Sequence, residues 1–209
     1  MGALSAIVQE CVRPGMFALT FDDGPSDQTL AVLQTLQQFN VKATFFVVGT
    51  NVDRSPTIVR SVYNAGHQIA LHSYSHPYFS GLSEDEARGE LDRQAVSVYS
   101  AIGVNPRFFR FPFGDSTTQY VKLVENVGYT IAGWDIDVRD FERFDSQGMV
   151  AEVQSILASS SSTSQSHIAL FHDSRVSTTE AVAGLIKTIQ ANGYRLVTMA
   201  ECRGEAAYF

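Results

Sequence analysis

The chain has 209 residues, of which 44% are hydrophobic and 18% are charged, and its formal net charge at pH 7 is −7. This size and composition are typical of a soluble globular protein that buries a large core without relying on metals or many disulfides. The negative charge and the lack of a run of Lys or Arg argue against binding to nucleic acid or anionic membranes, which need a concentrated positive face. No stretch reaches the roughly 18 apolar residues of a membrane span. We predict no membrane span in this chain, and we expect a monomer.

The first nine residues are too few and too uncharged to form a whole signal peptide. We therefore expect a mature or trimmed form, and membrane attachment through a segment outside this sequence stays open. The chain has two cysteines, Cys11 and Cys202, near its opposite ends. Composition alone leaves two interpretations of them: unrelated buried thiols, or a disulfide that indicates an oxidising compartment. Two thiolates alone cannot complete a four-ligand structural zinc site.

Short β-type runs alternate with amphipathic stretches along the chain. The runs predict strands at 17–21, 43–48, 68–71, 108–109, 130–134, 168–171 and 195–198. Apolar residues with helical spacing predict helices around 30–39, 58–62, 123–127 and 182–189. Ser83 with Glu86 forms a capping box for a further helix that should run to about Ile102. The Ser/Thr-rich stretch 159–166 should be an exposed loop between a helix and a strand, not a domain boundary.

This alternation predicts an α/β fold with parallel strands. About seven strands favour a closed or nearly closed (β/α) barrel, in a single domain, over an open doubly wound sheet. The open sheet is also disfavoured because no Gly-rich phosphate-binding fingerprint follows the first predicted strand.

Five predicted strands run directly into ionisable residues. In a parallel barrel the carboxyl ends of all strands open on one face, and that face carries the active site. The fold would therefore gather carboxylates, imidazoles and a guanidinium in one bowl, which favours an enzyme over a scaffold. The residues that follow these strands are Asp22 and Asp23, His72 and His76, Arg110, Asp135 and Asp137, and His172 and Asp173.

The histidine pair and the first aspartate pair are compatible with a metal site. His72 and His76 are four residues apart, so one helical turn would place both imidazoles on one side. Taken alone, such a pair is usually a solvated surface feature, and no Glu lies between the two as in the HExxH motif. The DDGP sequence at 22–25 can equally be a plain turn. One of its carboxylates can instead join the histidines in a three-ligand site that suits zinc or another divalent transition metal, while the other stays free as a base.

The other candidates also have a structural interpretation beside the chemical one. Arg110 is either a surface arginine held by aromatic neighbours or a clamp that orients a carboxylate. His172 is either a buried, hydrogen-bonded histidine or, in a bowl with a metal and carboxylates, an acid with a tunable pKa. Trp134 and Leu170 are either core residues or the walls of a small apolar pocket at the strand ends.

In this order, these motifs resemble those of the polysaccharide deacetylase family, also called NodB-homology domains or carbohydrate esterase family 4, and the pattern is most similar to fungal-type chitin deacetylases. The resemblance covers 17–202 and predicts a domain over 16–202, with an N-terminal extension (1–15) and a C-terminal tail (203–209). Each motif alone is weak, but five in register leave little room for coincidence. They lie at 20–25, 72–76, 110–114, 135–140 and 170–172.

The resemblance implies a distorted (β/α) barrel and a metal-dependent hydrolase that removes N-acetyl groups from chitin or a related amino-sugar polysaccharide. It implies one divalent metal ion, zinc in the first place, with cobalt or another transition metal as alternatives. It also implies a secreted protein, extracellular or at the cell wall, whose Cys11 and Cys202 form a disulfide. By position, the resemblance implies that Asp23, His72 and His76 are metal ligands, that Asp22 is the base and that Arg110 orients Asp22. It implies that His172 is the acid, with Asp137 as its partner and Asp140 as the rival for that place. It also implies that the backbone N–H of Phe113 is an oxyanion donor and that Trp134 and Leu170 form the pocket for the acetyl methyl.

Two positions depart from the family pattern. Phe141 stands where many members have Trp, and Phe113 where many have Tyr. Both changes can reshape the sugar groove, so the chemistry is better specified than the substrate. Two rival functions therefore stay open: an amidohydrolase of the same fold that acts on a non-chitin substrate such as a small amide, and a catalytically silent wall protein that binds glycan.

Overall fold

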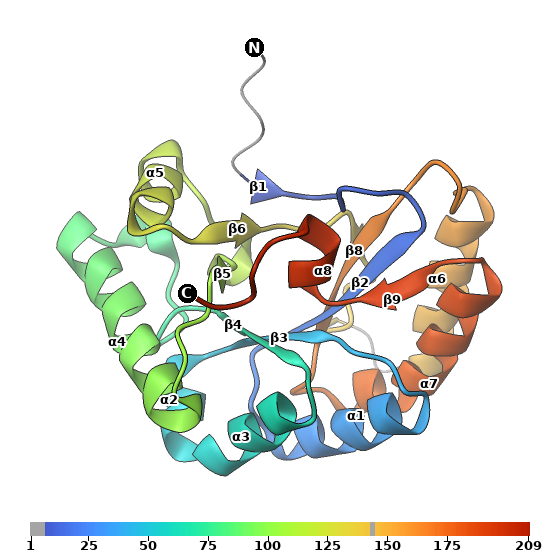
Figure 1. Cartoon of the computed structure of the whole chain (residues 1–209), viewed down its shortest axis with the longest axis horizontal. Coiled ribbons are helices and arrows are strands. Elements are labelled where there is room, and N and C mark those ends of the chain that lie inside the picture. The colour runs from blue at the N-terminus through green and yellow to red at the C-terminus, as the bar shows by residue number, and fades with distance from the viewer. Residues whose placement is uncertain (1–6, 143–144) are drawn as a thin grey trace.

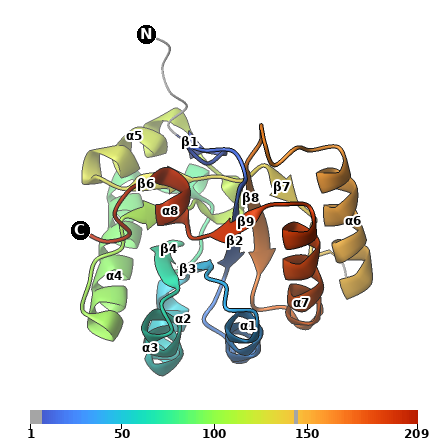
Figure 2. The same ribbon diagram turned by 45° about the vertical axis from the view of Figure 1, so that its right-hand side comes forward.

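Parallel strands alternate with helices along the chain, as the sequence predicts. The computed structural model describes residues 7–142 and 145–209, and its one sheet curves into an open, distorted barrel with helices outside it (Figure 1, Figure 2). The predicted (β/α) barrel is therefore confirmed. Residues 1–6 of the predicted N-terminal extension lie outside the described residues, and the domain limits at 16 and 202 stay a prediction.

The described strands form one nine-stranded sheet, two strands more than the sequence predicts. The additions are β1 and β7, each only two residues long. Every described strand pair is parallel, and the path β1-β6-β5-β4-β3-β2-β8-β7 leaves β9 beside β2. The strands are β1 (Ile7–Val8), β2 (Met16–Asp22), β3 (Thr44–Val47), β4 (Gln68–Leu71), β5 (Phe108–Phe109), β6 (Thr130–Ala132), β7 (Ile136–Asp137), β8 (His167–His172) and β9 (Arg195–Val197).

The five predicted helices are present, and three others were not predicted. The capping box of α4 forms as expected, since Ser83 Oγ accepts from Glu86 N and Glu86 Oε2 accepts from Ser83 N. Among the three others, α2 and α8 are short, whereas α6 carries a usable signal, because Met149, Val153 and Leu157 recur every four residues and are buried. The helices are α1 (Asp27–Gln38), α2 (Gly49–Arg54), α3 (Pro56–Asn64), α4 (Glu84–Ile102), α5 (Thr118–Val127), α6 (Ser146–Ala158), α7 (Val176–Ala191) and α8 (Met199–Arg203), with 3₁₀ turns η1 (Phe79–Gly81) and η2 (Pro112–Gly114). Within the two described ranges, no helix combines the length and the apolar character needed to cross a membrane.

Strand β2 shows how the sheet directs its side chains. Leu19 and Phe21 pack with the surrounding helices in one hydrophobic cluster, whereas Ala18 belongs to a second cluster that fills the barrel. Alternate residues of a strand point to opposite faces, so Asp22 shares the inner face with Ala18 and Thr20. The strand therefore places a carboxylate at the carboxyl end of the barrel interior.

Helix α8 closes the amino end of the barrel. Met199 N donates to Thr44 Oγ1, and Ala200 N donates to Gln68 Oε1, and these two acceptors are the first residues of β3 and β4. A disulfide joins Cys202 of the same helix to Cys11, which precedes β2. Since β9 pairs with the first residues of β2, the two cysteines come together although 191 positions separate them in the sequence.

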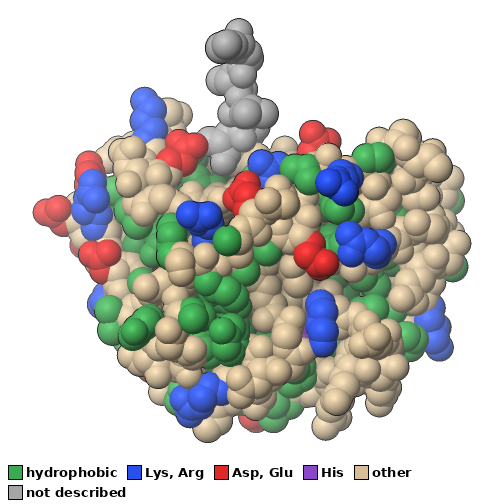
Figure 3. All heavy atoms as spheres, in the orientation of Figure 1, with side chains coloured by type: hydrophobic (Ala, Val, Ile, Leu, Met, Phe, Trp, Pro, Cys, Tyr) green, Lys and Arg blue, Asp and Glu red, His purple; other side chains and the backbone are tan. Residues whose placement is uncertain are grey.

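Charged side chains are dispersed on the face shown in Figure 3, where Lys and Arg lie singly with Asp and Glu among them. Two ion pairs lie near the end of the chain, the exposed pair of Arg195 with Glu201 and the half-buried pair of Arg203 with Glu205, each 3.5 Å apart. Exposed pairs of this kind contribute little to stability. Among the described residues, the positive charge of this face is not gathered into one patch.

We expect the disulfide to contribute strongly to stability. The chain-entropy model assigns roughly 5 kcal/mol, as an upper value, to so long a loop. Cys11→Ser and Cys202→Ser should each lower the free energy of unfolding by a large part of that amount in urea titrations. The double variant should lose no more than either single one, because all three remove the same bond. Intact mass with and without reductant, followed by thiol alkylation, is the control. Two freely alkylated cysteines in the unreduced native protein would contradict the bond.

Candidate active site

The carboxyl ends of the strands open on a cleft of about 400 Å³. Asp22 ends β2, His72 follows β4 and His172 ends β8, so the parallel register brings these three residues to one rim. Arg110 is fully buried, and its guanidinium contacts Asp22 from the barrel interior. The sequence-predicted residues that line the cleft are Asp22, Asp23, His72, His76, Phe113, Trp134, Asp137, Leu170 and His172.

Asp23, His72 and His76 form a cluster with the spacing of a metal site. Asp23 Oδ1 lies 3.2 Å from His76 Nε2 and 3.6 Å from His72 Nε2, and one ligand atom from each residue lies within 4.8 Å of the others. Asp23 Oδ1 is buried without a hydrogen-bond partner, which is costly unless another group meets it. One carboxylate oxygen and two imidazole nitrogens suit zinc or another divalent transition metal. The residues present therefore fit such an ion.

The two histidines come together on an irregular turn and not on a helix, which corrects the expectation of a helical turn. Ser73 and His76 both have left-handed backbone, with φ of 60° and 61°, and the chain runs through bends and loop from the end of β4 to the start of η1. Ser73 Oγ accepts a hydrogen bond from His76 N at 3.0 Å. This hydrogen bond folds the turn so that the second imidazole comes back beside the first, with 4.9 Å between the centroids of the His72 and His76 rings.

The protonation states of the cluster suit metal binding. His72 Nδ1 lies 2.9 Å from the carbonyl oxygen of Arg110, so that acceptor assigns the ring proton to Nδ1 and leaves the Nε2 lone pair free. Burial lowers the pKa of His72 and keeps the ring neutral, although nearby carboxylates act in the opposite direction. Burial raises the pKa of Asp23, but the close contact with His76 and the electrostatic influence of the neighbouring histidines outweigh it and lower that pKa to about 2.

Glu90 of α4 braces this turn, and the sequence analysis missed it. Its buried carboxylate accepts hydrogen bonds from Ser75 N at 2.7 Å and from Ser75 Oγ at 2.8 Å. Arg93 Nη2 donates to the same carboxylate and its guanidinium lies over the ring of Tyr74, 4.6 Å from the centroid. The available signal was a carboxylate beside Leu91 on the buried face of a helix, where an unpaired charge is rare.

Asp22 is held by Arg110 as the resemblance implies. Arg110 Nη1 donates to Asp22 Oδ1 at 2.8 Å and to Thr20 Oγ1 at 2.7 Å, and Nη2 donates to Gly133 O at 2.9 Å. Asp22 Oδ2 lies 3.6 Å from His72 Nε2. One carboxylate oxygen is therefore fixed by the guanidinium, and the other faces the histidine cluster.

His172 is paired with Asp140, so the expectation that Asp137 is its partner was wrong and the rival was right. His172 Nδ1 lies 2.6 Å from Asp140 Oδ1, and His172 N donates to Asp140 Oδ2 at 2.7 Å. Thr178 Oγ1 also donates to Asp140 Oδ2, whereas Asp137 Oδ1 accepts from Arg139 N. Asp137 lies within β7, short of the end of β8. Left-handed backbone at Arg139 (φ 54°) then turns Asp140 towards the carboxyl end of β8, where His172 lies.

The charge of Asp140 determines the protonation of His172. Burial lowers the pKa of His172, but the hydrogen bond and charge of Asp140, with the charges of Asp22 and Asp23, outweigh it and raise that pKa to about 9. The imidazole of the metal-free protein is therefore protonated at neutral pH. Its Nδ1 faces Asp140, which leaves Nε2 for the cleft.

Asp173 is a second residue that the sequence analysis did not assign. Its carboxyl is buried, Oδ2 accepts from Thr29 Oγ1, and Oδ1 has no hydrogen-bond partner. Burial raises its pKa to about 7. A Cβ at Gly24 would lie only 2.4 Å from Asp173 Oδ2, so the glycine is needed for this close approach. Ser26 Oγ donates to Asp173 O at 3.0 Å, and these contacts hold the turn that follows Asp23.

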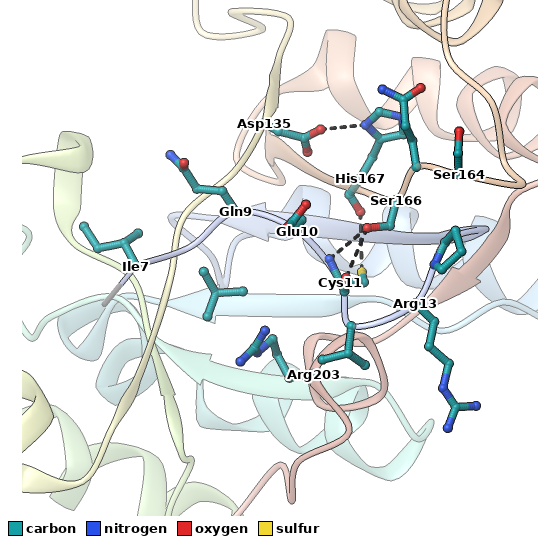
Figure 4. A pocket seen from close by; sticks show the side chains of 14 residues that line it. Ile7, Gln9, Glu10, Cys11, Arg13, Asp135, Ser164, Ser166, His167 and Arg203 are labelled. Carbon is teal, nitrogen blue, oxygen red and sulfur yellow. Dashed lines mark hydrogen bonds and ion pairs between the residues drawn. The ribbon is translucent and has the colours of Figure 1, made fainter. Parts of the chain in front are cut away.

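A larger hollow of about 560 Å³ lies beside the disulfide, lined in part by residues 7–14 (Figure 4). Asp135 Oδ2 lies 2.6 Å from His167 Nδ1, and Ser160 Oγ lies 2.7 Å from His167 Nε2, which is the order of a Ser–His–Asp triad. However, Ser160 does not line the hollow, and its hydroxyl is shared with Tyr194. We therefore assign function to the smaller cleft, where the candidate residues converge.

Comparisons with known proteins identify the family to which this chain is similar. A family model described as "Polysaccharide deacetylase" matches residues 9–132. The peptidoglycan-N-acetylglucosamine deacetylase PgdA of Listeria monocytogenes is 34% identical over 90% of this chain, and the match spans only 39% of that relative's length. A chitin deacetylase of Colletotrichum lindemuthianum is 30% identical over 95% of this chain and 84% of its own. The solved structure of the chitin deacetylase from that fungus superposes with a TM-score of 0.91 at 29% identity, over 97% of this chain and 94% of that one.

The pairing of His172 predicts its titration. In the metal-free protein His172 should titrate near pH 9, and Asp140→Asn should lower that pKa by removing the charge that opposes burial. NMR titration of the ring C–H signals measures both values. Asp137→Asn is the matched control, because it removes a neighbouring carboxylate that does not contact His172, and a larger shift in this variant than in Asp140→Asn would contradict the assignment.

The same pairing links stability to pH. Since the folded-state pKa of His172 is raised above 6.5, the pairing contributes its full stabilisation below pH 6.5, and this contribution is lost as pH rises through about 9.

The brace at Glu90 predicts an effect on metal affinity. Glu90→Gln keeps the shape of the side chain but removes the charge and presents an NH₂ group to the donors around it. We expect zinc affinity to fall about 10- to 100-fold, as is typical when a group that orients metal ligands is lost, and competition with a chromophoric chelator measures this. Glu84→Gln on the same helix is the control, because Glu84 makes an exposed ion pair with Arg88. Equal zinc affinities of the two variants would refute the role of Glu90.

Proposed function

Because the chain belongs to the polysaccharide deacetylase family, we propose that it removes N-acetyl groups from an amino-sugar polysaccharide, with chitin or a chitin-like polymer of N-acetylglucosamine as substrate. One observation carries this proposal: the cluster of Asp23, His72 and His76 lies between a carboxylate fixed by Arg110 and a histidine paired with an aspartate. Metal ligands, a base and an acid thus share one cleft.

Asp23, His72 and His76 would hold one divalent metal ion. Zinc is our first choice, with cobalt or another transition metal as alternatives. The ionised carboxylate and the two imidazole nitrogens described above are the donor set that such ions prefer. When bound, the ion supplies Lewis acidity at the amide carbonyl and lowers the pKa of a water molecule in the cleft.

The protein's own residues carry the proton transfers. Arg110 holds Asp22 Oδ1, so Oδ2 takes a proton from the water whose oxygen bonds to the amide carbon. The backbone N–H of Phe113 stabilises the resulting oxyanion. His172, protonated at neutral pH by its pairing with Asp140, gives its Nε2 proton to the sugar nitrogen as the C–N bond breaks. The products are acetate and a free amino sugar.

Trp134 and Leu170 provide an apolar pocket for the acetyl methyl group. Both side chains line the cleft, and Leu170 is 5% exposed. A methyl group gains about 0.8 kcal/mol when it leaves water for such a surface, whereas a formyl group has none to bury. The pocket therefore favours acetyl over smaller acyl groups.

A location outside the cell, extracellular or at the cell wall, is proposed together with the polymer substrate. The disulfide between Cys11 and Cys202 is stable in an oxidising compartment and rare in the cytosol. The relatives named above act, by their names, on peptidoglycan N-acetylglucosamine and on chitin. Both polymers lie outside the cytosol, which agrees with secretion.

Acetate release tests the activity directly. Chitin oligomers, peptidoglycan and xylan would each be incubated with the protein after loading with zinc or cobalt, and with a chelator-treated sample as the control. We expect release from chitin oligomers that stops when the metal is removed. Release from small N-acetyl amides but from none of the polymers would favour the amidohydrolase instead. Glycan binding without any release would favour the silent wall protein.

The two neighbouring aspartates should respond differently to the same substitution. Asp22→Asn should keep zinc and lower kcat by about 10²–10⁴-fold, the usual contribution of a general base. Asp23→Asn should lose zinc affinity, because it removes a charged ligand. Zinc content after dialysis and initial rates of acetate release measure the two effects. If Asp22→Asn loses zinc and Asp23→Asn keeps it, the two roles are exchanged.

A further inference from the structure

Two aromatic rings lie stacked and exposed at the rim of the cleft. The rings of Tyr78 and Phe113 have centroids 4.0 Å apart and an interplanar angle of 11°, and the two residues are 59% and 56% exposed. Phe113 lines the cleft, and its ring centroid lies 4.5 Å from that of His76. The stack therefore leads from one proposed metal ligand outwards to solvent.

Core packing does not explain this exposure. Phe79 and Phe111, close to the stacked residues in sequence, are buried and pack edge to face with centroids 5.1 Å apart. Each segment thus sends one aromatic ring into the core and holds another outside. Burial of a large apolar side chain is favourable, so two adjacent rings left in water indicate a surface that meets a ligand.

The stacked pair is held in place before any ligand arrives. Asp115 Oδ2 accepts from Ser80 N at 2.8 Å, which ties the segment of Tyr78 to the turn of Phe113. Phe113 has left-handed backbone, with φ of 59°, a conformation that a residue other than glycine keeps only where the surrounding structure holds it. A preformed surface of this kind loses little conformational entropy on binding.

The chemistry of the pair suits a sugar ring. The two rings carry no charge, and the phenol of Tyr78 is their one polar group. A pyranose ring presents axial C–H groups on its face and hydroxyls at its edge, so its face stacks on an aromatic ring while its hydroxyls stay in water. Since Phe113 separates Tyr78 from His76, the unit on the stack is a neighbour of the unit that reacts.

We propose that Tyr78 and Phe113 form an aromatic platform that binds a pyranose unit of the glycan next to the unit being deacetylated. This rests on the proposed function, because it takes the histidine cluster as the place of reaction. The competing explanation is that the stack only shields His76 from solvent. The two explanations differ in whether the effect of a substitution depends on the length of the glycan.

The test compares Tyr78→Ala with Tyr99→Ala on N-acetylglucosamine oligomers of increasing length, from dimer to hexamer. Tyr99 is the matched control, because it is 53% exposed on α4 and does not line the cleft. We expect Tyr78→Ala to raise KM for the hexamer about tenfold, with a smaller rise for the dimer and little change in kcat, as for the loss of one aromatic contact. Tyr78→Phe should restore the wild-type KM, and Tyr99→Ala should match the wild type.

Other results would overturn the platform. An equal loss on dimer and hexamer, a fall in kcat at constant KM, or a fall in zinc affinity would show that the stack serves His76 instead. Calorimetric binding of the hexamer to Asp22→Asn, with and without Tyr78→Ala, separates this proposal from the proposed function. If the wild type releases no acetate but Tyr78→Ala weakens hexamer binding, the proposed function fails and Tyr78 still binds glycan. If acetate is released and Tyr78→Ala behaves as Tyr99→Ala does, the platform fails alone.

Discussion

The buried ion pair between Arg110 and Asp22 is the contact around which the cleft is arranged. A guanidinium in a protein interior is costly unless its N–H groups find acceptors, and Arg110 meets Asp22, Thr20 and the carbonyl of Gly133 while its guanidinium stacks on the ring of Phe46, 4.1 Å from the centroid. Its backbone carbonyl also faces the Nδ1 of a proposed metal ligand. Arg110 therefore fixes the proposed base, sets the tautomer of His72, and links β2 to the segment after β6. Removing it would leave a carboxylate buried without its counter-charge, so a loss of activity in such a variant could not be separated from a loss of fold.

Backbone strain is concentrated at the cleft. Apart from Asn40, the non-glycine residues described with positive φ lie in the loops that build the site, where the chain must turn sharply to bring polar side chains back over the barrel. The surrounding packing and hydrogen bonds, such as those of the buried Glu90 carboxylate, hold these turns in place. The residues are Asp23, Ser73, His76, Phe113 and Arg139.

The apolar strands and the capped helix could be predicted because their signals are local. The bounds of β4 and β5 and the end of α4 agree with the predicted ones. Local sequence patterns could not predict which side chains contact one another across loops. The sequence favoured Asp137 over Asp140 as the partner of His172, but the left-handed turn between the two brings Asp140 to the histidine. The braces at Glu90 and Asp173 depend on contacts between elements distant in sequence, so the sequence marks them only as carboxylates in apolar surroundings.

The filled barrel interior limits how ligands can enter and leave the site. Below the cleft the interior is occupied by side chains such as Ala18, Phe46 and Phe108, and Met199 of α8 packs in the same cluster. Under the proposed function, glycan and water would then enter, and acetate would leave, by the same mouth. A polymer lying across that mouth would stand in the path of the departing acetate.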